Sequence, residues 1–206
     1  MIVFETIRHA VSVSGKVSDA LSGFALAGAW VEIVTGPADF EDERATLSAA
    51  PGWDQMAQRI DRTFSQADGS YAFIDLPAGT YQLKVSLPQA GRRYGSLAIN
   101  NVAVSGQRDS AGRVQIALAD AALTPTQVQG SVTRQDNNQP IAGASIGLRG
   151  DTHSVLSDAN GHYLLRDLDA VSPTVTAAAA NFKPFSQAVN LTPGAALNLN
   201  IVLVPA

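Results

Sequence analysis

Short stretches of alternating apolar and polar residues run along most of the 206-residue chain. Alternation with a period of two is typical of β-strands that bury one face. Glycine, proline, asparagine and aspartate residues separate the stretches and mark turns. In the first half, the pattern predicts strands at residues 11–17, 29–34, 70–76, 80–87 and 97–105. In the second half, it predicts strands at residues 126–132, 144–150, 162–168, 173–179, 187–191 and 197–204.

The second half of the chain repeats the first. The stretch from Val13 to Ile33 aligns without a gap with the stretch from Val128 to Leu148, at an offset of 115 residues. A second block, "DGSYAFIDLPA" against "NGHYLLRDLDA", aligns at an offset of 92 residues. Similarity that keeps its order over two blocks indicates an internal repeat. The two offsets differ because the first copy holds about 23 extra residues between Ile33 and Gly69.

Most positions that the copies share are typical of turns and strand ends. Asp68-Gly69 and Asn160-Gly161 favour tight hairpins, because these residue types tolerate positive φ. Asp75 and Asp167 each follow a predicted strand, where an aspartate can accept hydrogen bonds from the amides of the following turn. The shared motif therefore predicts a scaffold. The other identical positions are Val13/Val128, Gly15/Gly130, Val17/Val132, Tyr71/Tyr163, Leu76/Leu168, Ala78/Ala170 and the Ala-Gly-Ala at residues 27–29 and 142–144.

Many short strands in each copy predict the fold class. Seven strands within roughly 100 residues are typical of a small antiparallel sandwich. We therefore expect an all-β protein made of two tandem seven-stranded antiparallel Greek-key sandwiches. The expected first domain covers residues 1–121 and the second covers residues 122–206, divided near the stretch at 119–126.

The extra residues of the first copy, at about 37–62, break the alternation. They are charged and contain few β-branched residues, so we expect one or two short helices there. Asp39 is the expected cap of the first helix, and Pro51 is expected to end it. The expected inward side consists of Phe40, Leu47, Trp53, Met56 and Ile60.

Composition and charge narrow the function classes. Fourteen basic and eighteen acidic residues give a net charge of −4, and the largest basic cluster is the pair Arg92-Arg93. We therefore expect no nucleic acid partner. The absence of cysteine excludes disulfides and thiolate metal sites.

No apolar run in the sequence is long enough to span a bilayer, so we expect no membrane insertion. The N-terminus lacks the pattern of a signal peptide. We expect a cytoplasmic protein or a part of a cytoplasmically assembled particle. If the chain is a piece of a longer one, the expected location is extracellular.

The combined motifs resemble a known family. The pattern is Gly-x-Val, then "ALAGAWVEI" or "PIAGASIGL", then Asp-Gly or Asn-Gly before an aromatic, and "DLPAGTYQLKV". It resembles the carboxypeptidase regulatory-like domain, a transthyretin-like (prealbumin-like) β-sandwich. The resemblance is more specific in the first copy, because the second replaces the Gly-x-Tyr at "DLDAVSPTVTA".

This resemblance implies two transthyretin-like sandwiches and a non-catalytic role. In the family, the domain usually spaces, supports or presents other modules. Tandem copies without a signal are also similar to accessory components of phage-tail-like contractile injection particles. The resemblance thus implies a structural protein that docks on a larger assembly.

Candidate catalytic and metal groups do not form a recognisable set. His9, His153 and His162 lack the spacing of metal ligands, and His162 is expected on the solvent side of its strand. No serine stands in a nucleophile motif with a base, and the turn aspartates do not form a calcium loop. Transthyretin-like folds include a hydrolase of 5-hydroxyisourate, but this chain ends in "IVLVPA" and lacks its Tyr-Arg-Gly-Ser-type tail and its histidines. We predict a non-enzymatic protein without cofactor or metal.

Features that the copies do not share are the candidates for partner binding. Trp30 is expected to point outward from its strand. Trp53 and Phe40 belong to the insertion, and the alternative is that one of them packs on the Trp30 ring. The loop Arg92-Arg93-Tyr94 is a further candidate, because loops often carry contacts. Its alternative is an ordinary solvated loop.

These candidates support three functional hypotheses. The leading one is a structural or interaction module that binds a protein partner in a larger assembly. The second is a carbohydrate-binding or adhesive module that uses Trp30, Trp53 or Tyr94. The third is an extracellular spacer domain of a larger protein.

Overall fold

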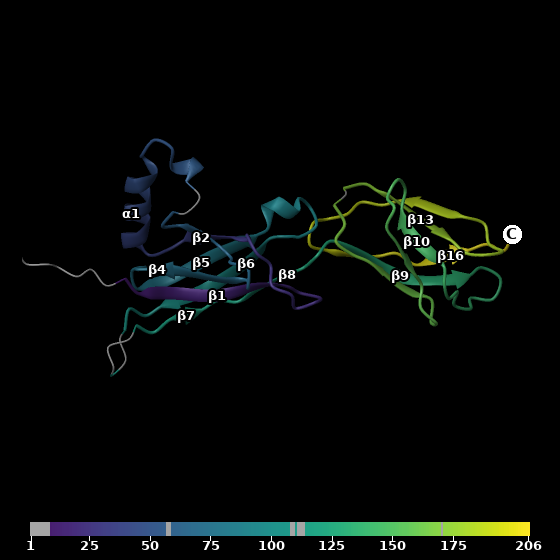
Figure 1. Cartoon of the computed structure of the whole chain (residues 1–206), viewed down its shortest axis with the longest axis horizontal. Helices are drawn as coiled ribbons and strands as arrows, with labels where there is room; N and C mark the ends of the chain where they lie inside the picture. Colours follow the sequence, from purple (N-terminus) through teal and green to yellow (C-terminus); the bar gives the residue numbers. More distant parts are fainter. Residues whose placement is uncertain (1–8, 57–58, 108–109, 111–113, 170) are drawn as a thin grey trace, which may run out of the picture. The chain divides into compact units, whose positions relative to one another are not determined.

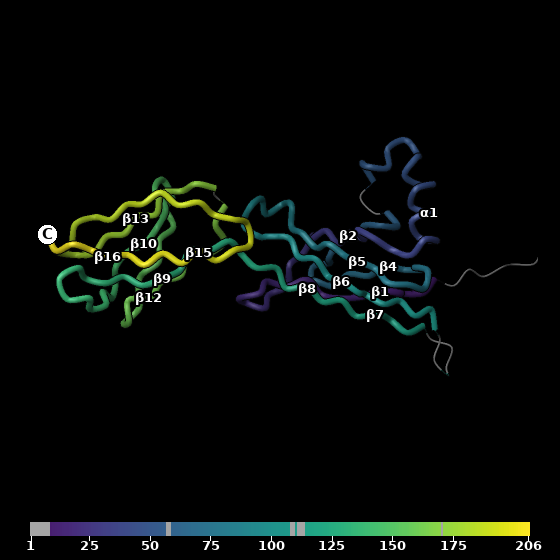
Figure 2. The backbone as a smooth tube through the Cα atoms, turned by 180° about the vertical axis from the view of Figure 1, so that it is seen from behind, coloured from purple at the N-terminus to yellow at the C-terminus, as the bar shows by residue number. Residues whose placement is uncertain are grey.

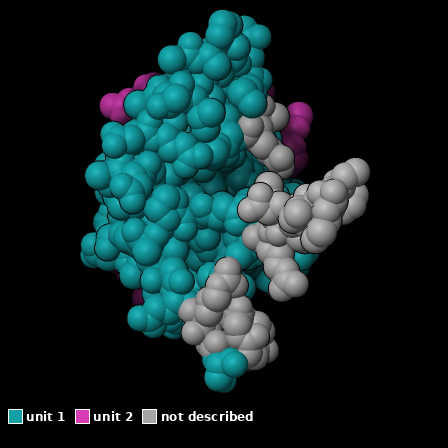
Figure 3. Space-filling view, turned by 90° about the vertical axis from the view of Figure 1, so that its left-hand side faces the viewer, with its two compact units in different colours: residues 1–89, 96–123 teal, residues 90–95, 124–206 magenta. Residues whose placement is uncertain are grey.

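The chain folds into two compact, mostly β units in the computed structural model, which describes residues 9–56, 59–107, 110, 114–169 and 171–206 (Figure 1). Unit 1 consists of Met1–Gln89 and Ser96–Leu123, and unit 2 of Ala90–Gly95 and Thr124–Ala206 (Figure 3). The units are therefore not separated by a single cut, because a short segment from within the first copy packs with unit 2.

Unit 1 is built from two sheets with a buried apolar layer between them. One sheet has the order β4-β1-β7, with β8 also on β1, and the other has the order β3-β2-β5-β6. The strands are β1 Val11–Asp19, β2 Trp30–Thr35, β3 Arg62–Phe64, β4 Ser70–Ile74, β5 Gly79–Ser86, β6 Leu97–Val104, β7 Ala117–Leu118 and β8 Ala121–Leu123. A short 3-10 helix, η2 Pro88–Ala90, follows β5.

Unit 2 repeats this order with a second set of strands. One sheet has the order β12-β9-β15, with β16 also on β9, and the other has the order β11-β10-β13-β14. Figure 2 labels strands of both sheets, among them β9, β15, β10 and β13. Thus β9 is the counterpart of β1, and β10 of β2. The strands are β9 Gln127–Arg134, β10 Ser145–Leu148, β11 Ser154–Leu156, β12 His162–Leu165, β13 Thr174–Ala178, β14 Phe185–Ala188, β15 Ala196–Asn198 and β16 Ile201–Leu203.

The last strands of each unit run parallel to the first strand. β7 and β8 pair with β1 in parallel, and β15 and β16 pair with β9 in the same way. The expected all-antiparallel arrangement is therefore wrong at this edge. The expected seven strands also differ from the eight strand segments in the described part of each unit. An alternating pattern carries no information on strand direction, which is why the sequence could not reveal the parallel pair.

A tyrosine hydroxyl lies at the break between the two last strands of each unit. In unit 1, the Tyr71 hydroxyl donates to the backbone carbonyl of Ala119, which lies between β7 and β8. In unit 2, the Tyr163 hydroxyl donates to the carbonyl of Leu199 over 2.6 Å, between β15 and β16. Both tyrosines are buried. The hydroxyl thus satisfies a carbonyl group at the point where the ladder is interrupted.

A glycine on the neighbouring strand makes room for this carbonyl. Gly15 pairs with Tyr71 across β1 and β4, and Gly130 pairs with Tyr163 across β9 and β12. A Cβ atom on either glycine would lie 2.1 Å from the carbonyl oxygen of the broken strand. No side chain fits at that distance. The glycine and the tyrosine that the two copies share therefore serve one structural purpose.

A buried serine in each unit joins two further segments. Ser65 Oγ donates to the carbonyl of Leu26 over 2.6 Å and accepts from the amide of Ala29 over 2.8 Å. Ser157 makes the two corresponding bonds in unit 2, at 2.6 and 3.0 Å. The sequence pattern does not single out these serines, because their partners lie far away in the chain.

Asp75 fixes the beginning of β1 and not the turn that follows it, which corrects the expectation from the sequence. Its carboxylate accepts a hydrogen bond from the Ala10 amide over 2.8 Å and contacts the imidazole of His9. The hydrogen bond from His9 holds the pKa of Asp75 below its ordinary value. Asp75 and Asp167 have φ values of 55° and 60°, so both end their strands in the left-handed region.

The first prediction concerns the glycine beneath the broken strand. We expect Gly130→Ala to lower the free energy of unfolding of unit 2 by about 3 kcal/mol, because the methyl group meets a backbone carbonyl that cannot move aside cheaply. Urea unfolding followed by the methyl NMR signals of unit 2 measures the loss. Thr133→Ala on the same strand is the control and should cost less than about 1 kcal/mol. Equal losses in the two variants would contradict this account.

The second prediction concerns alkaline pH. Burial raises the pKa of Tyr163 to about 12 from 10.0. Because the folded-state pKa is the higher one, the neutral hydroxyl contributes its full stability below pH 10, and this contribution is lost as the pH rises toward 12. We expect unit 2 to lose stability over this range, as followed by its methyl NMR signals in urea. Tyr163→Phe should be about 1 kcal/mol less stable at neutral pH and should lose less in alkali. If the stability of the Tyr163→Phe variant fell with pH as steeply as that of the original protein, the alkaline loss could not be due to Tyr163.

Candidate functional site

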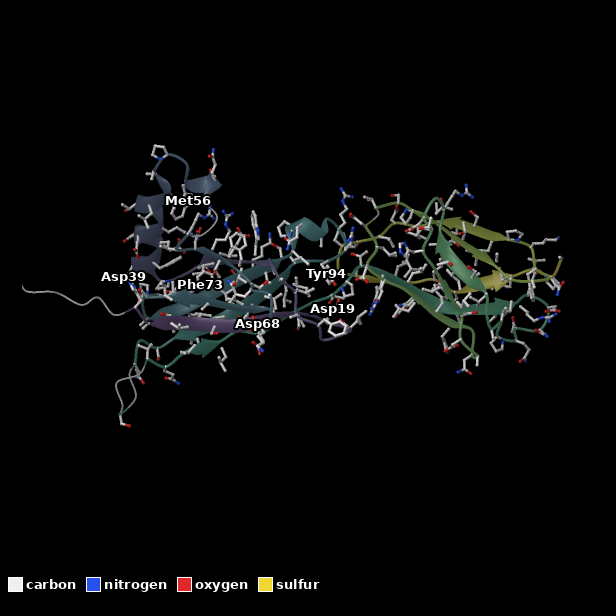
Figure 4. All side chains as sticks on the ribbon, viewed as in Figure 1. Asp19, Asp39, Met56, Asp68, Phe73 and Tyr94 are labelled. Atoms are coloured by element: carbon white, nitrogen blue, oxygen red, sulfur yellow. The ribbon has the colours of Figure 1, made fainter. Side chains whose placement is uncertain are left out.

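The insertion between β2 and β3 forms α1 Ala38–Ser48 and the 3-10 helix η1 Trp53–Gln55 (Figure 4). Pro37 occupies the N-cap position of α1, and Asp39 lies in the first turn, so the expected cap at Asp39 is wrong. The fixed φ of a proline prepares the chain to enter a helix without a side-chain cap. The helix ends before Pro51.

Phe40 anchors α1 in the end of the sandwich. Its side chain is 1% exposed, and its ring meets Tyr81 edge-on with the centroids 5.5 Å apart. The guanidinium of Arg44 lies 5.7 Å from the same ring. A ring that is buried in this way cannot contact a partner. Phe40 is therefore removed from the candidate contact residues, and it closes the end of unit 1 instead.

The rest of the expected inward side is only partly buried or exposed. Leu47 and Met56 are 39% and 49% exposed, and Trp53 and Ile60 are half-buried. Leu47 lies two helical turns from Phe40, roughly 10 Å along the axis. Only the first turn of α1 therefore reaches the core.

Two tryptophan rings in unit 1 are each covered by an arginine. The guanidinium of Arg62 lies 4.4 Å from the centroid of Trp30, and that of Arg59 lies 5.0 Å from the centroid of Trp53. Trp30 also meets Phe64 edge-on, with centroids 5.9 Å apart. The ring of Trp30 is thus covered by an arginine of β3, and not by the Trp53 or Phe40 ring. We call Trp30, Trp53, Arg59 and Arg62 the Trp–Arg cluster.

Backbone and carboxylate groups hold the two guanidinium groups in place. Arg59 Nε donates to Asp61 over 2.8 Å, and Arg62 donates to the backbone carbonyl of Met56. Arg62 is 7% exposed, and its buried Nε has no acceptor among the described residues. A buried donor without an acceptor costs about 1–3 kcal/mol, and in a native fold it calls for an explanation.

The insertion and the strand before it carry exposed apolar side chains. Val34 at the end of β2 is 43% exposed, and Leu47 and Met56 of the insertion are exposed as well. Figure 4 shows Met56 on the insertion, away from the core residue Phe73. Exposed apolar side chains are candidates for contacts with a partner protein.

The predicted contact loop Arg92-Arg93-Tyr94 is built into unit 2. The Arg92 amide donates to Asp169 over 2.9 Å, and the Arg92 carbonyl accepts from Thr126 Oγ1 over 2.6 Å. The Thr126 amide donates to the carbonyl of Arg93 over 2.7 Å. Tyr94 forms a β-bridge with Pro125. The backbone of this loop is therefore fixed, while the side chains of Arg92 and Arg93 are exposed.

Thr126 is the centre of this arrangement. It is completely buried, and its hydroxyl also accepts a hydrogen bond from the Gly194 amide over 2.8 Å. Gly95 and Gly194 touch so closely that a Cβ on Gly194 would lie 2.5 Å from the Cα of Gly95. Unit 2 therefore depends on the segment Ala90–Gly95, which lies within the first copy in the sequence.

An open groove of about 1250 Å³ lies beside this loop in unit 2. It runs along the edge strands of the two sheets, β11 and β12. Three arginines, Arg93, Arg149 and Arg166, line it. Apolar lining residues include Leu148, Val155, Leu165, Leu168 and Pro173.

One protein family model matches part of the chain. Residues 127–204 match the carboxypeptidase regulatory-like domain. This is the family that the sequence motifs resemble. The match falls on the second copy, although that copy departs from the motif at "DLDAVSPTVTA". No curated protein matches the chain.

Several solved structures are similar at low scores. A cohesin–X-dockerin complex from Acetivibrio cellulolyticus is 25% identical with a TM-score of 0.34, over 39% of this chain and 58% of that one. The chain thus spans less than two thirds of the length of that relative. A streptococcal ancillary pilin is 15% identical with a TM-score of 0.36, over 96% of this chain and 62% of that one. The shaft pilin SpaA from Lactobacillus rhamnosus GG is 12% identical with a TM-score of 0.40, over 98% of each chain. Similarity at this level does not establish a shared function.

Two of the histidines lie in unit 2. His162 is exposed on β12, and the His153 imidazole lies 3.2 Å from Asp151. Within the described ranges, no group of three or more histidine, cysteine or acidic residues is arranged to hold a metal ion. The same part of the chain contains no helix long and apolar enough to cross a membrane.

The third prediction tests the role of Thr126. Thr126→Val keeps the shape of the side chain but leaves the Arg92 carbonyl and the Gly194 amide without a partner. We expect unit 2 to lose about 2–4 kcal/mol, because each unpaired buried group costs about 1–3 kcal/mol. Methyl NMR in urea measures the loss. Thr124→Val, at an exposed neighbouring threonine, should be close to neutral. A stable Thr126→Val variant would show that the loop is not needed by unit 2.

Proposed function

We propose that the protein is a non-enzymatic structural and interaction module that docks on a larger protein assembly through the Trp–Arg cluster. The observation that carries this proposal is the stacking of Arg62 on Trp30 and of Arg59 on Trp53, beside exposed apolar side chains of the insertion. This surface has no counterpart in unit 2, where Ser145 takes the place of Trp30.

Tryptophan and arginine are suited to this role. Both are enriched among the residues that dominate binding energies at protein interfaces. In the cluster, the guanidinium groups are already stacked and bonded, so binding does not need to order them again.

The buried hydroxyl groups support a structural role over a catalytic one. Ser65 and Ser157 donate to backbone carbonyls of their own unit, and so does Thr126. A serine nucleophile instead needs to donate to a general base. These hydroxyl groups are thus occupied by the scaffold.

The carbohydrate-binding alternative is less well supported. A sugar ring stacks on a free aromatic face, whereas one face of Trp30 and one face of Trp53 are covered by guanidinium groups. Tyr94, the third aromatic of that hypothesis, belongs to the other unit. We therefore place protein docking first. An extracellular spacer of a larger protein stays a prediction.

A phage-tail-like contractile injection particle is one assembly that fits this proposal. Its support is the resemblance of the tandem copies to accessory components of such particles. A cytoplasmic site of assembly belongs to the same proposal.

The fourth prediction tests docking by site-specific crosslinking in the native host. A photo-reactive amino acid at Met56, whose side chain is exposed beside the cluster, should crosslink to one defined protein. The same group at Leu118, which is 81% exposed in unit 1 but outside the insertion, is the control and should give no such product.

Substitution within the cluster separates docking from folding. Trp53→Ala with Arg59→Glu should reduce the crosslinked product at least about tenfold, since truncating a residue that dominates an interface costs about 2 kcal/mol or more. Circular dichroism should show that the variant stays folded. A free protein without crosslinks at Met56, or an unchanged yield in the folded variant, would refute docking through the cluster.

A further inference from the structure

The groove of unit 2 lies where unit 1 is closed by its own residues. Ile33 pairs with Leu83 in unit 1, and Leu148 pairs with Val175 in unit 2, at the same place of the equivalent sheets. This register agrees with the offsets of 115 and 92 residues between the copies. By the same offsets, the groove residues Leu165 and Leu168 correspond to core residues of the unit 1 sandwich, Phe73 and Leu76.

Two aromatic rings close this place in unit 1 and are missing in unit 2. Phe40 and Tyr81 pack edge-on there, and each is 1% exposed. In unit 2, Pro173 stands at the position of Tyr81 and lines the groove. The insertion that carries Phe40 is replaced by the short connection at residues 149–153 between β10 and β11. By the alignment, the groove thus lies at the position that corresponds to these two rings in the other copy.

The charges in the two units indicate one kind of ligand for the groove. The segment that fills the corresponding position in unit 1 is acidic, and arginines line the groove in unit 2. In unit 1, the segment that carries Phe40 is acidic, with Asp39, Glu41, Asp42 and Glu43 beside Phe40 in the sequence. In unit 2, three arginines line the groove, and no described carboxylate forms an ion pair with Arg93 or Arg149. The three aspartates of the lining each contact a group of unit 2 itself.

Asp169 accepts the amide of Arg92, and Asp151 accepts the amide of His153 over 3.0 Å. Asp167 lies 3.6 Å from Arg166. Three arginines and three aspartates thus line the groove, and among the described residues only Arg166 pairs with an aspartate of the lining. Arg93 and Arg149 are exposed, and the Arg149 guanidinium donates to Ser186 Oγ over 2.8 Å. Arg93 and Arg149 are therefore the two groups of the groove with which an acidic ligand can pair.

We propose that this groove binds a short acidic segment of a partner protein, which inserts one aromatic side chain between the two sheets as Phe40 does in unit 1. The site lies in unit 2 and uses none of the Trp–Arg cluster. Binding in the groove can therefore be tested separately from docking through the Trp–Arg cluster of unit 1.

A peptide that copies the acidic segment of the insertion is the probe for this site. Residues 36–50, "GPADFEDERATLSAA", carry Phe40 with its acidic neighbours. A fluorescently labelled peptide is titrated with the full chain, and anisotropy is recorded. Methyl NMR of the full chain locates the binding. We expect saturable binding that shifts the methyl signals of Leu148 and Leu165 and leaves those of Ile33 unchanged.

Matched variants test the two parts of the proposal. Phe40→Ala in the peptide should weaken binding at least about tenfold, because the buried ring supplies most of the apolar contact. Arg93→Glu and Arg149→Glu in the full chain should each weaken binding about tenfold, and Lys183→Glu, an equal charge change outside the groove, should not. Pro173→Tyr should also weaken binding, because it restores one of the two rings.

Several results would overturn the proposal. Absence of saturable binding at millimolar peptide is one. Equal binding of the Phe40→Ala peptide would exclude the aromatic insertion, and unchanged binding by Arg93→Glu and Arg149→Glu would exclude an acidic ligand. Shifts confined to unit 1 would place the peptide elsewhere. A negative crosslink at Met56 affects none of these readouts, so the two proposals can be told apart.

Discussion

The architecture of both units depends on one buried hydrogen bond between a tyrosine hydroxyl and the carbonyl of a broken strand. Tyr71 and Tyr163 take up the carbonyl that leaves the ladder, and the glycine across from each makes the space for it. Neither residue type can be exchanged alone: a side chain at the glycine would displace the carbonyl, and loss of the hydroxyl would leave that carbonyl buried without a donor. The last strands can therefore align in parallel with the first strand of the same sheet.

With this scaffold in common, the two copies differ mainly at their ends. Unit 1 uses an insertion whose first helical turn places Phe40 against Tyr81, and beyond that turn the chain exposes Leu47, Met56 and the Trp–Arg cluster. Unit 2 lacks both rings and is left with an open groove, while it takes up the segment Ala90–Gly95 around Thr126. The same core thus supports two different surfaces, and both proposals of function concern residues that the copies do not share.

Much of the fold could be predicted from the sequence. Strand alternation depends only on neighbouring residues, and the repeat is visible when the two copies are aligned. Alternating residues marked most strands, and the shared glycine and tyrosine marked the scaffold without showing how they act together. Strand direction could not be predicted, since parallel and antiparallel strands alternate alike. The candidate site was harder. The role of Phe40 depends on where α1 enters the sandwich, the stacking of Arg62 on Trp30 depends on the pairing of β3 with β2, and the fixation of Arg92 depends on Thr126, which is distant in the chain.

The central claim concerns the position that Phe40 and Tyr81 fill in unit 1. The corresponding position in unit 2 is an open groove. Titration of the full chain with phenol, followed by methyl NMR, tests it directly, because a small aromatic molecule enters an open apolar groove but not a filled one. The account predicts saturable shifts of the methyl signals of Leu148, Leu165 and Leu168, with the signals of Ile33 and Leu76 unchanged. Shifts of equal size at both sets, or shifts at Ile33 and Leu76 alone, would contradict it.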